Sequence, residues 1–151
     1  MKYFNGVILS IILLFLSACS ASQEEISQMR YQCEEQGRIN PFYLSLSFPN
    51  SKKIKNIKIN RKKNGKIIES FAVQPNDNGI WIKNDFYIHD TYEFIIDGEK
   101  PFILTNVKTS LQTHCTWQGC KYPCEIDEAY LNGKQATIIN NGIEIRKENY
   151  E

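Results

Sequence analysis

The chain has 151 residues, with 18 lysines and arginines against 17 aspartates and glutamates, which gives a formal net charge of +1. Only one of the basic residues lies within the first 18 positions, so the charges of the remainder balance. A balanced charge provides no electrostatic argument for nucleic-acid binding, and we expect no nucleic-acid partner. The length fits a single domain with a hydrophobic core of its own.

The N-terminus has the pattern of a secretory signal. Lys2 precedes an apolar run over residues 7–16, which is interrupted only by Ser10. This run is too short for a transmembrane helix, which needs about 20 apolar residues. We therefore expect residues 1–18 to be a cleaved signal peptide rather than an uncleaved anchor.

The apolar run ends in Leu16-Ser17-Ala18-Cys19. This motif resembles the lipobox of bacterial lipoproteins, in which an aliphatic residue and two small residues precede the cysteine that receives the lipid. The resemblance covers residues 1–20 and implies nothing about the fold of the mature chain. It implies that Cys19 becomes the N-terminal residue and carries a diacylglycerol thioether and an N-acyl chain, which together anchor a protein stably.

The residues after Cys19 suggest a location and a domain boundary. Ser20, where an aspartate would retain an enterobacterial lipoprotein in the inner membrane, implies the outer membrane, with the lipid as the membrane attachment. Residues 19–29 are mostly polar and acidic, and we expect them to form the lipidated N-terminus and a tether. Residues 30–151 are then expected to form one β domain.

Four further cysteines remain for this domain: Cys33, Cys115, Cys120 and Cys124. An even number in an exported domain predicts two disulfides. In each of the three possible pairings Cys33 joins the C-terminal cluster, which closes a loop of roughly 85 residues and stabilises the fold by ~4.5 kcal/mol. Gly119 could let the short loop turn and therefore favours Cys115–Cys120 with Cys33–Cys124. The alternative is a zinc site formed by the thiols and His114, but the paired C-x-x-C spacing of such sites is missing.

Strand patterns dominate the rest of the sequence. Residues 42–48 alternate apolar and polar side chains, and Asn64-Gly65 is a typical hairpin turn between residues 55–61 and 67–73. Further strands are expected over residues 80–82, 85–88, 92–96, 101–104, 107–117, 136–139 and 143–146, and only residues 23–35 could form a helix. Many short strands separated by turns predict an all-β fold, either a small antiparallel β-sandwich (immunoglobulin-like) or a barrel, stapled by two disulfides.

Two groups of residues are candidates for binding a partner. Trp117 and Tyr122 lie within the cysteine cluster, and aromatic side chains on a cross-linked loop lose little entropy on binding. The second group is a basic segment that contains no acidic residue, comprising Lys52, Lys53, Lys55, Lys58, Arg61, Lys62, Lys63 and Lys66. It could attract an anionic surface or an acidic protein, or it could protect an exposed strand edge.

The sequence provides little support for catalysis. The two histidines, His89 and His114, have no identifiable Ser-His-Asp partners, and the common nucleophile, zinc-protease and nucleotide motifs are absent. The acidic residues Glu125-Ile126-Asp127-Glu128 lack the spacing of a calcium loop and fit a solvated turn. We expect a non-enzymatic protein without a metal or cofactor.

The leading hypothesis is a lipid-anchored envelope lipoprotein that binds another envelope protein. One alternative is a periplasmic antagonist, either a toxin-immunity protein or a lysozyme inhibitor. The chain is similar to the periplasmic lysozyme-inhibitor lipoproteins in size, in β-rich character and in Tyr31-Gln32-Cys33 near the start of the domain, although the C-terminal cysteine of that family is missing. The other alternative is a structural accessory of a secretion or surface-assembly system.

Overall fold

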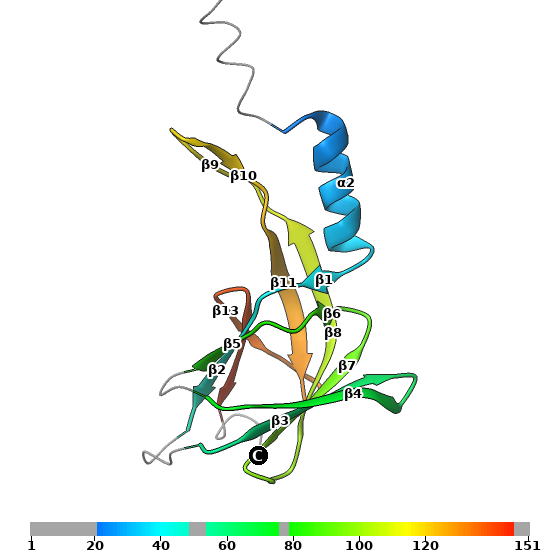
Figure 1. Ribbon diagram of the computed structural model, residues 1–151, viewed down its shortest axis with the longest axis vertical. Helices are drawn as coiled ribbons and strands as arrows, with labels where there is room; N and C mark the ends of the chain where they lie inside the picture. Colours follow the sequence, from blue (N-terminus) through cyan, green and yellow to red (C-terminus); the bar gives the residue numbers. More distant parts are fainter. Residues whose placement is uncertain (1–20, 49–53, 76–78, 147–151) are drawn as a thin grey trace, which may run out of the picture.

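The computed structural model describes residues 21–48, 54–75 and 79–146 (Figure 1). The expected signal peptide, Cys19, Lys52 and Lys53 lie outside the described residues. What the sequence predicts for them therefore stays a prediction.

The described chain contains one helix followed by short strands. The elements in chain order are α2 (Gln23–Glu34), β1 (Arg38–Ile39), β2 (Phe42–Ser47), β3 (Ile57–Lys63), β4 (Lys66–Val73), β5 (Gly79–Ile82), β6 (Phe86–Tyr87), β7 (Thr91–Ile96), β8 (Phe102–Leu111), β9 (His114–Thr116), β10 (Gly119–Lys121), β11 (Cys124–Leu131), β12 (Lys134–Gln135), β13 (Thr137–Ile139) and β14 (Gly142–Arg146). The expectation of an all-β fold is confirmed, and a single helix precedes the strands among the described residues.

Two main sheets face each other and enclose the core. One has the order β12-β11-β8-β7-β3-β4, and the other has the order β13-β14-β2-β5. The pairs β1–β6 and β9–β10 form separate two-stranded ribbons. All pairs are antiparallel except β14 with β2, so the antiparallel sandwich or barrel expected from the sequence contains one parallel pair.

The core consists of inward-facing aliphatic and aromatic side chains from both sheets. Phe42 stacks on Phe86 with ring centroids 4.0 Å apart, and Phe86 stacks on Tyr92 at 4.2 Å. Ile143 and Ile145, which lie on one face of β14, are fully buried in the same core. Burial of these side chains stabilises the sandwich by roughly 1.5 to 3 kcal/mol for each large residue.

Turn chemistry sets the hairpins where the sequence predicts them. Asn64 and Gly65 have φ of 51° and 75°, and these positive values are the ones that a two-residue type I′ turn requires. Gly142 is needed for a different reason: a Cβ atom there would lie 1.7 Å from the main-chain oxygen of Tyr43 in the neighbouring parallel strand.

The C-terminal half differs from the sequence prediction. Glu125, Asp127 and Glu128 do not form a solvated turn, because they lie in β11, which pairs along β8 in the larger sheet. Ile126 and Ala129 of this strand are buried. The alternation is broken by register shifts at Ile126/Glu128 and Glu128/Tyr130, which is why its period of two cannot be read from the sequence.

The expected tether is also partly structured, because α2 begins at Gln23. Ser22 caps the helix: its hydroxyl accepts the Glu25 N–H, and the Glu25 carboxylate accepts the Ser22 N–H. Cys33 is the one buried residue of this helix. The helix therefore has no continuous apolar face with which to hold its place on the sheets.

Two disulfides fasten the N-terminal helix and the cysteine loop. Cys33 bonds Cys124 across 91 positions, and Cys115 bonds Cys120 across five. The favoured pairing is thus confirmed, and the zinc alternative is wrong because all four sulfurs are in disulfide bonds. Thr109 adds a second link, since its hydroxyl donates to the main-chain oxygen of Cys33 at 2.7 Å.

Removing the long disulfide should destabilise the domain more than removing the short one. We expect Cys33→Ser/Cys124→Ser to lower the free energy of unfolding by about 4 to 5 kcal/mol and Cys115→Ser/Cys120→Ser by about 2 kcal/mol, because the unfolded chain gains more freedom from the longer loop. Urea unfolding of both double variants measures this difference. Equal losses would contradict the assignment of Cys33–Cys124 as the main covalent constraint.

Candidate functional site

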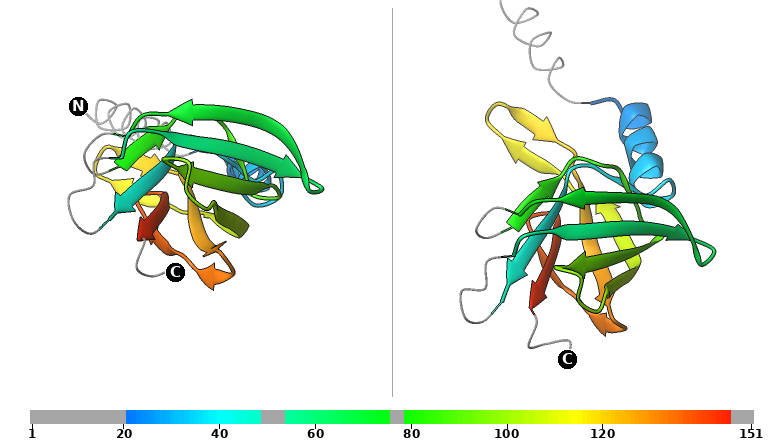
Figure 2. Two further views of the ribbon diagram at one scale, coloured as in Figure 1. Left: turned by 90° about the horizontal axis from the view of Figure 1, so that it is seen from below. Right: turned by 60° about the horizontal axis from the view of Figure 1, so that its bottom comes forward.

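Two elements project together from one end of the sandwich. Helix α2 rises from the Cys33–Cys124 bond, and the β9–β10 hairpin rises beside it from the ends of β8 and β11 (Figure 1; Figure 2, right). The base of the hairpin is closed by the Gln112 N–H, which donates to the Pro123 carbonyl at 2.9 Å. The two disulfides therefore lie at the same end as both projections.

The two aromatic candidates of the cysteine loop have different environments. Trp117, in the turn between β9 and β10, is 92% exposed. Tyr122 is half-buried and lines a cleft of about 470 Å³ at the base of the hairpin, together with Met29 and Leu111. The structure thus separates an exposed anchor at the tip from a cleft residue at the base.

The β3–β4 hairpin is the second candidate surface. Strand β4 forms one edge of the larger sheet, where β3 is its one partner among the described strands. Ile67 and Ile68 at its start are 54% and 50% exposed. Lys58 and Lys63 are exposed and make no ion pair with another described residue. An edge strand with exposed apolar and cationic side chains is a surface that can pair with another chain.

The other two basic candidates are engaged within the protein. The Arg61 Nε donates to the Asp90 carboxylate at 2.6 Å, and its guanidinium lies 3.9 Å from the centroid of the Tyr87 ring. Lys62 pairs with Glu93, and this hydrogen bond lowers the pKa of that carboxyl. The basic segment is therefore neutralised in part, because the acids that pair with it come from β7 and the turn before it, far along the sequence.

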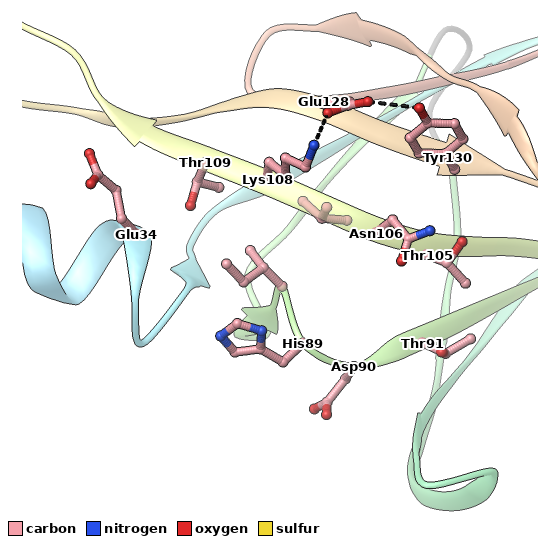
Figure 3. Close-up of a pocket in the computed structure, with 12 residues that line it drawn as sticks. Glu34, His89, Asp90, Thr91, Thr105, Asn106, Lys108, Thr109, Glu128 and Tyr130 are labelled. Atoms are coloured by element: carbon pink, nitrogen blue, oxygen red, sulfur yellow. Dashed lines mark hydrogen bonds and ion pairs between the residues drawn. The ribbon is translucent and has the colours of Figure 1, made fainter.

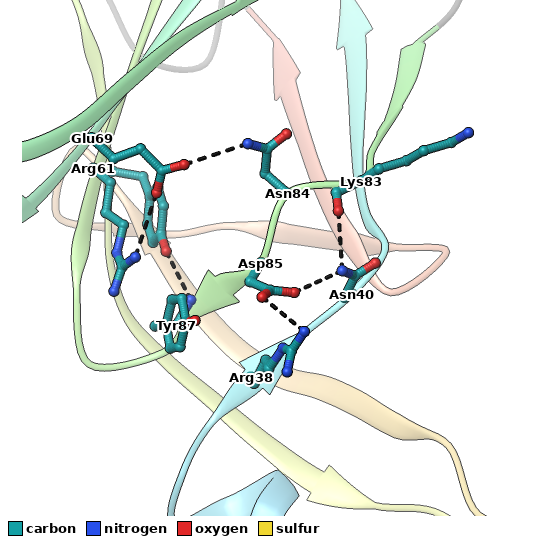
Figure 4. A network of polar contacts seen from close by, with 9 residues as sticks. Arg38, Asn40, Arg61, Glu69, Lys83, Asn84, Asp85 and Tyr87 are labelled. Atoms are coloured by element: carbon teal, nitrogen blue, oxygen red, sulfur yellow. Dashed lines mark hydrogen bonds and ion pairs between the residues drawn. The ribbon is translucent and has the colours of Figure 1, made fainter.

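A polar network surrounds Arg61 (Figure 4). Arg61 also reaches Glu69 at 3.4 Å, and the Asn84 amide donates to the same carboxylate. Close by, Asp85 accepts hydrogen bonds from Arg38 at 2.8 Å and from Asn40 at 2.7 Å. These contacts join β1, β3, β4 and the loop before β6, so we assign this network a structural role.

A hollow runs over β8 and β11 and contains His89 (Figure 3). Its volume is about 740 Å³, and its polar contacts are internal: the Lys108 ammonium lies 2.5 Å from the Glu128 carboxylate, to which the Tyr130 hydroxyl donates at 2.7 Å. The His89 ring contacts the main-chain oxygen of Glu35 at 3.0 Å. Neither His89 nor His114, which pairs with Glu125, contacts a hydroxyl or thiol within the described part of the chain.

The described residues contain neither a metal-ligating cluster nor a membrane-spanning helix. Within residues 21–48, 54–75 and 79–146, no three side chains of the metal-ligating types gather around one point. No helix in these ranges is long and apolar enough to cross a bilayer.

Comparisons with known proteins identify no relative. No family model, no curated protein and no solved structure matches this chain.

Loss of Arg61 should affect folding. We expect Arg61→Ala to lower the free energy of unfolding by about 3 kcal/mol, because it leaves the Asp90 carboxylate buried without its cation. The matched control Lys58→Ala, on the same strand and exposed, should change it by less than about 0.5 kcal/mol. Urea unfolding monitored by circular dichroism compares the two, and similar small effects would contradict a structural role for Arg61.

Tyr92, next to this network, should make stability depend on alkaline pH. Burial raises the pKa of its hydroxyl from 10.0 to about 12. The folded state therefore holds the proton more tightly than the unfolded state, and its contribution to stability is lost as the pH rises from about 10 towards about 12. Urea unfolding from about pH 8 to about pH 11 should show a smaller alkaline loss in Tyr92→Phe than in the parent. Identical slopes would contradict this contribution.

Proposed function

We propose that this chain is a lipid-anchored, non-catalytic protein of the bacterial envelope, and that its β domain binds another protein through the β3–β4 hairpin. The anchor is the lipid on Cys19, and the sorting residue Ser20 favours the outer membrane. The binding role is carried by one observation, the exposed edge strand β4 with its two exposed isoleucines.

Two features support export and anchoring. The motif Leu16-Ser17-Ala18-Cys19 follows a signal-like apolar run. The two disulfides bind all four cysteines of the domain, and such bonds form and persist in oxidising compartments outside the cytosol.

The exposed edge supports a protein partner that adds a strand to the sheet. β4 has eight residues, whereas β12, the opposite edge strand of the same sheet, has two. An edge strand of this length offers main-chain donors and acceptors to an extended segment, while Ile67 and Ile68 offer apolar contacts. This mode of recognition requires a peptide backbone in the partner.

The charge around β4 indicates an acidic partner segment. Lys63 and Lys66 lie opposite each other across the Asn64-Gly65 turn, and Lys58 lies beside Ala72. Glu69, the one acid in the strand, is taken up by Arg61 and Asn84. Such a cationic edge attracts carboxylates and repels a second copy of itself.

Cross-linking in the envelope tests this proposal. We expect a photo-cross-linking residue at Ile67 to capture a partner, and one at Ile103, which is 38% exposed on β8 away from the edge, to capture none. Lys63→Glu/Lys66→Glu should weaken binding of that partner by at least about tenfold, because two attractive charges become repulsive. The charge-matched control Lys100→Glu/Lys134→Glu, with Lys134 in β12 at the opposite edge of the sheet, should leave its affinity unchanged.

Equal capture from both positions, or equal affinity of both charge variants, would contradict binding at β4. The identity of a captured partner then distinguishes the roles open to such a protein. A toxin or a lysozyme indicates an antagonist, and a component of a secretion system indicates an accessory.

A further inference from the structure

We propose that the tip of the β9–β10 hairpin lies in the headgroup region of the membrane that carries the lipid anchor, with Trp117 as a second point of attachment that orients the domain. This inference rests on the proposed anchoring at Cys19. It goes beyond it because it assigns a lipid surface, rather than a protein, as the ligand of the exposed tryptophan.

Helix α2 and the β9–β10 hairpin extend about equally far from the sandwich. Helix α2 extends about 16 Å from Cys33 to the N-cap residue Ser22, at 1.5 Å per residue. From Leu111, which pairs with Cys124, to Trp117, an extended strand covers at most about 20 Å. Because both start at the Cys33–Cys124 junction and point the same way (Figure 1; Figure 2, right), the hairpin tip lies about level with the start of the helix.

The proposed lipid on Cys19 is separated from helix α2 by only a short segment of chain. Cys19 precedes Ser22 by three positions, and three residues span at most about 11 Å. A lipid on Cys19 therefore holds the start of α2 within about 11 Å of the membrane surface. The Cys33–Cys124 bond joins the base of the helix to β11, from which the hairpin extends. A hairpin tip at the height of the start of α2 then lies within reach of the same surface.

The tip of the β9–β10 hairpin carries a side chain suited to a membrane interface. An indole ring has an apolar body and one N–H donor, and tryptophan is enriched where membrane and water meet. Trp117 is 92% exposed although it is a large aromatic, and the Cys115–Cys120 bond closes its loop. Glu24 and Glu25 lie in the first turn of α2 at the same end, so the attraction is to the interface itself and does not require anionic lipid.

This arrangement also explains the division between the two hairpins. The β3–β4 hairpin projects sideways from the opposite half of the molecule (Figure 1). A domain resting on Trp117 therefore presents β4 away from the lipid surface. The membrane and the protein partner would then contact different surfaces of the domain.

The chain contains two tryptophans, Trp81 and Trp117, which allows a matched fluorescence test. Lipidated Trp81→Phe retains Trp117, and lipidated Trp117→Phe retains Trp81, which is 50% exposed on β5. Both proteins are reconstituted into vesicles of phosphatidylethanolamine and phosphatidylglycerol that contain a lipid spin-labelled near the headgroup, and into neutral phosphatidylcholine vesicles with the same label. We expect Trp117 to be quenched at least roughly twofold more than Trp81 in both compositions.

Equal quenching of the two tryptophans would overturn the inference and leave the tip free for a protein. Quenching of Trp117 in the anionic vesicles alone would overturn the claim that the interface itself is recognised. Circular dichroism of both variants checks that each is folded.

Mass spectrometry of the same samples shows whether Cys19 carries a lipid. It thereby distinguishes a failure of the proposed anchoring from a failure of this inference. If Cys19 carries no lipid, the proposed anchoring fails. Because the other four cysteines are in disulfides, Cys19 is then the one free thiol of a chain beginning there. Coupling it to a maleimide lipid places the domain on the same vesicles, and the depth of Trp117 tests the inference alone.

Discussion

The Cys33–Cys124 disulfide is the constraint on which the N-terminal end of this protein depends. Helix α2 buries Cys33 and no other residue, so apolar packing alone cannot hold it against the sheets. The bond and the Thr109 hydrogen bond to Cys33 fix the end of the helix to β11 and β8. They thereby fix the direction from which a lipid anchor would pull on the domain.

Part of the basic segment is paired with acidic side chains of the same domain, and part of it is exposed. Arg61 and Lys62 belong to the densest basic segment of the sequence, yet they are held by Asp90 and Glu93. What remains exposed is a smaller cationic edge around Lys58, Lys63 and Lys66. Among the described residues these three lysines form no ion pair, so they are the charges that the proposed partner would meet.

The proposed membrane contact and the proposed protein contact use different parts of the domain. In the proposed arrangement, the end with the disulfides, the helix and Trp117 would face the membrane, and the edge strand β4 would face the periplasm or the outside. A fixed orientation of this kind raises the effective concentration of β4 towards any partner on or near the same membrane, because the domain does not have to reorient on binding. The lipid and the tryptophan would then serve the same end as the disulfides, which is to reduce the freedom of the domain before binding.

By itself, the sequence determined the local features: most of the strands and turns, the all-β class, the pairing that Gly119 favours, and the candidates Trp117 and Tyr122. These depend on residues close together in the chain, where periodicity and turn chemistry act directly. The tertiary structure decided the place of β11, because register shifts break its alternation, and the fate of Arg61 and Lys62, because their partners lie about 30 positions away. It also decided that Trp117 and the start of α2 share one end, since contacts between distant segments, closed by a disulfide across 91 positions, cannot be read from local pattern.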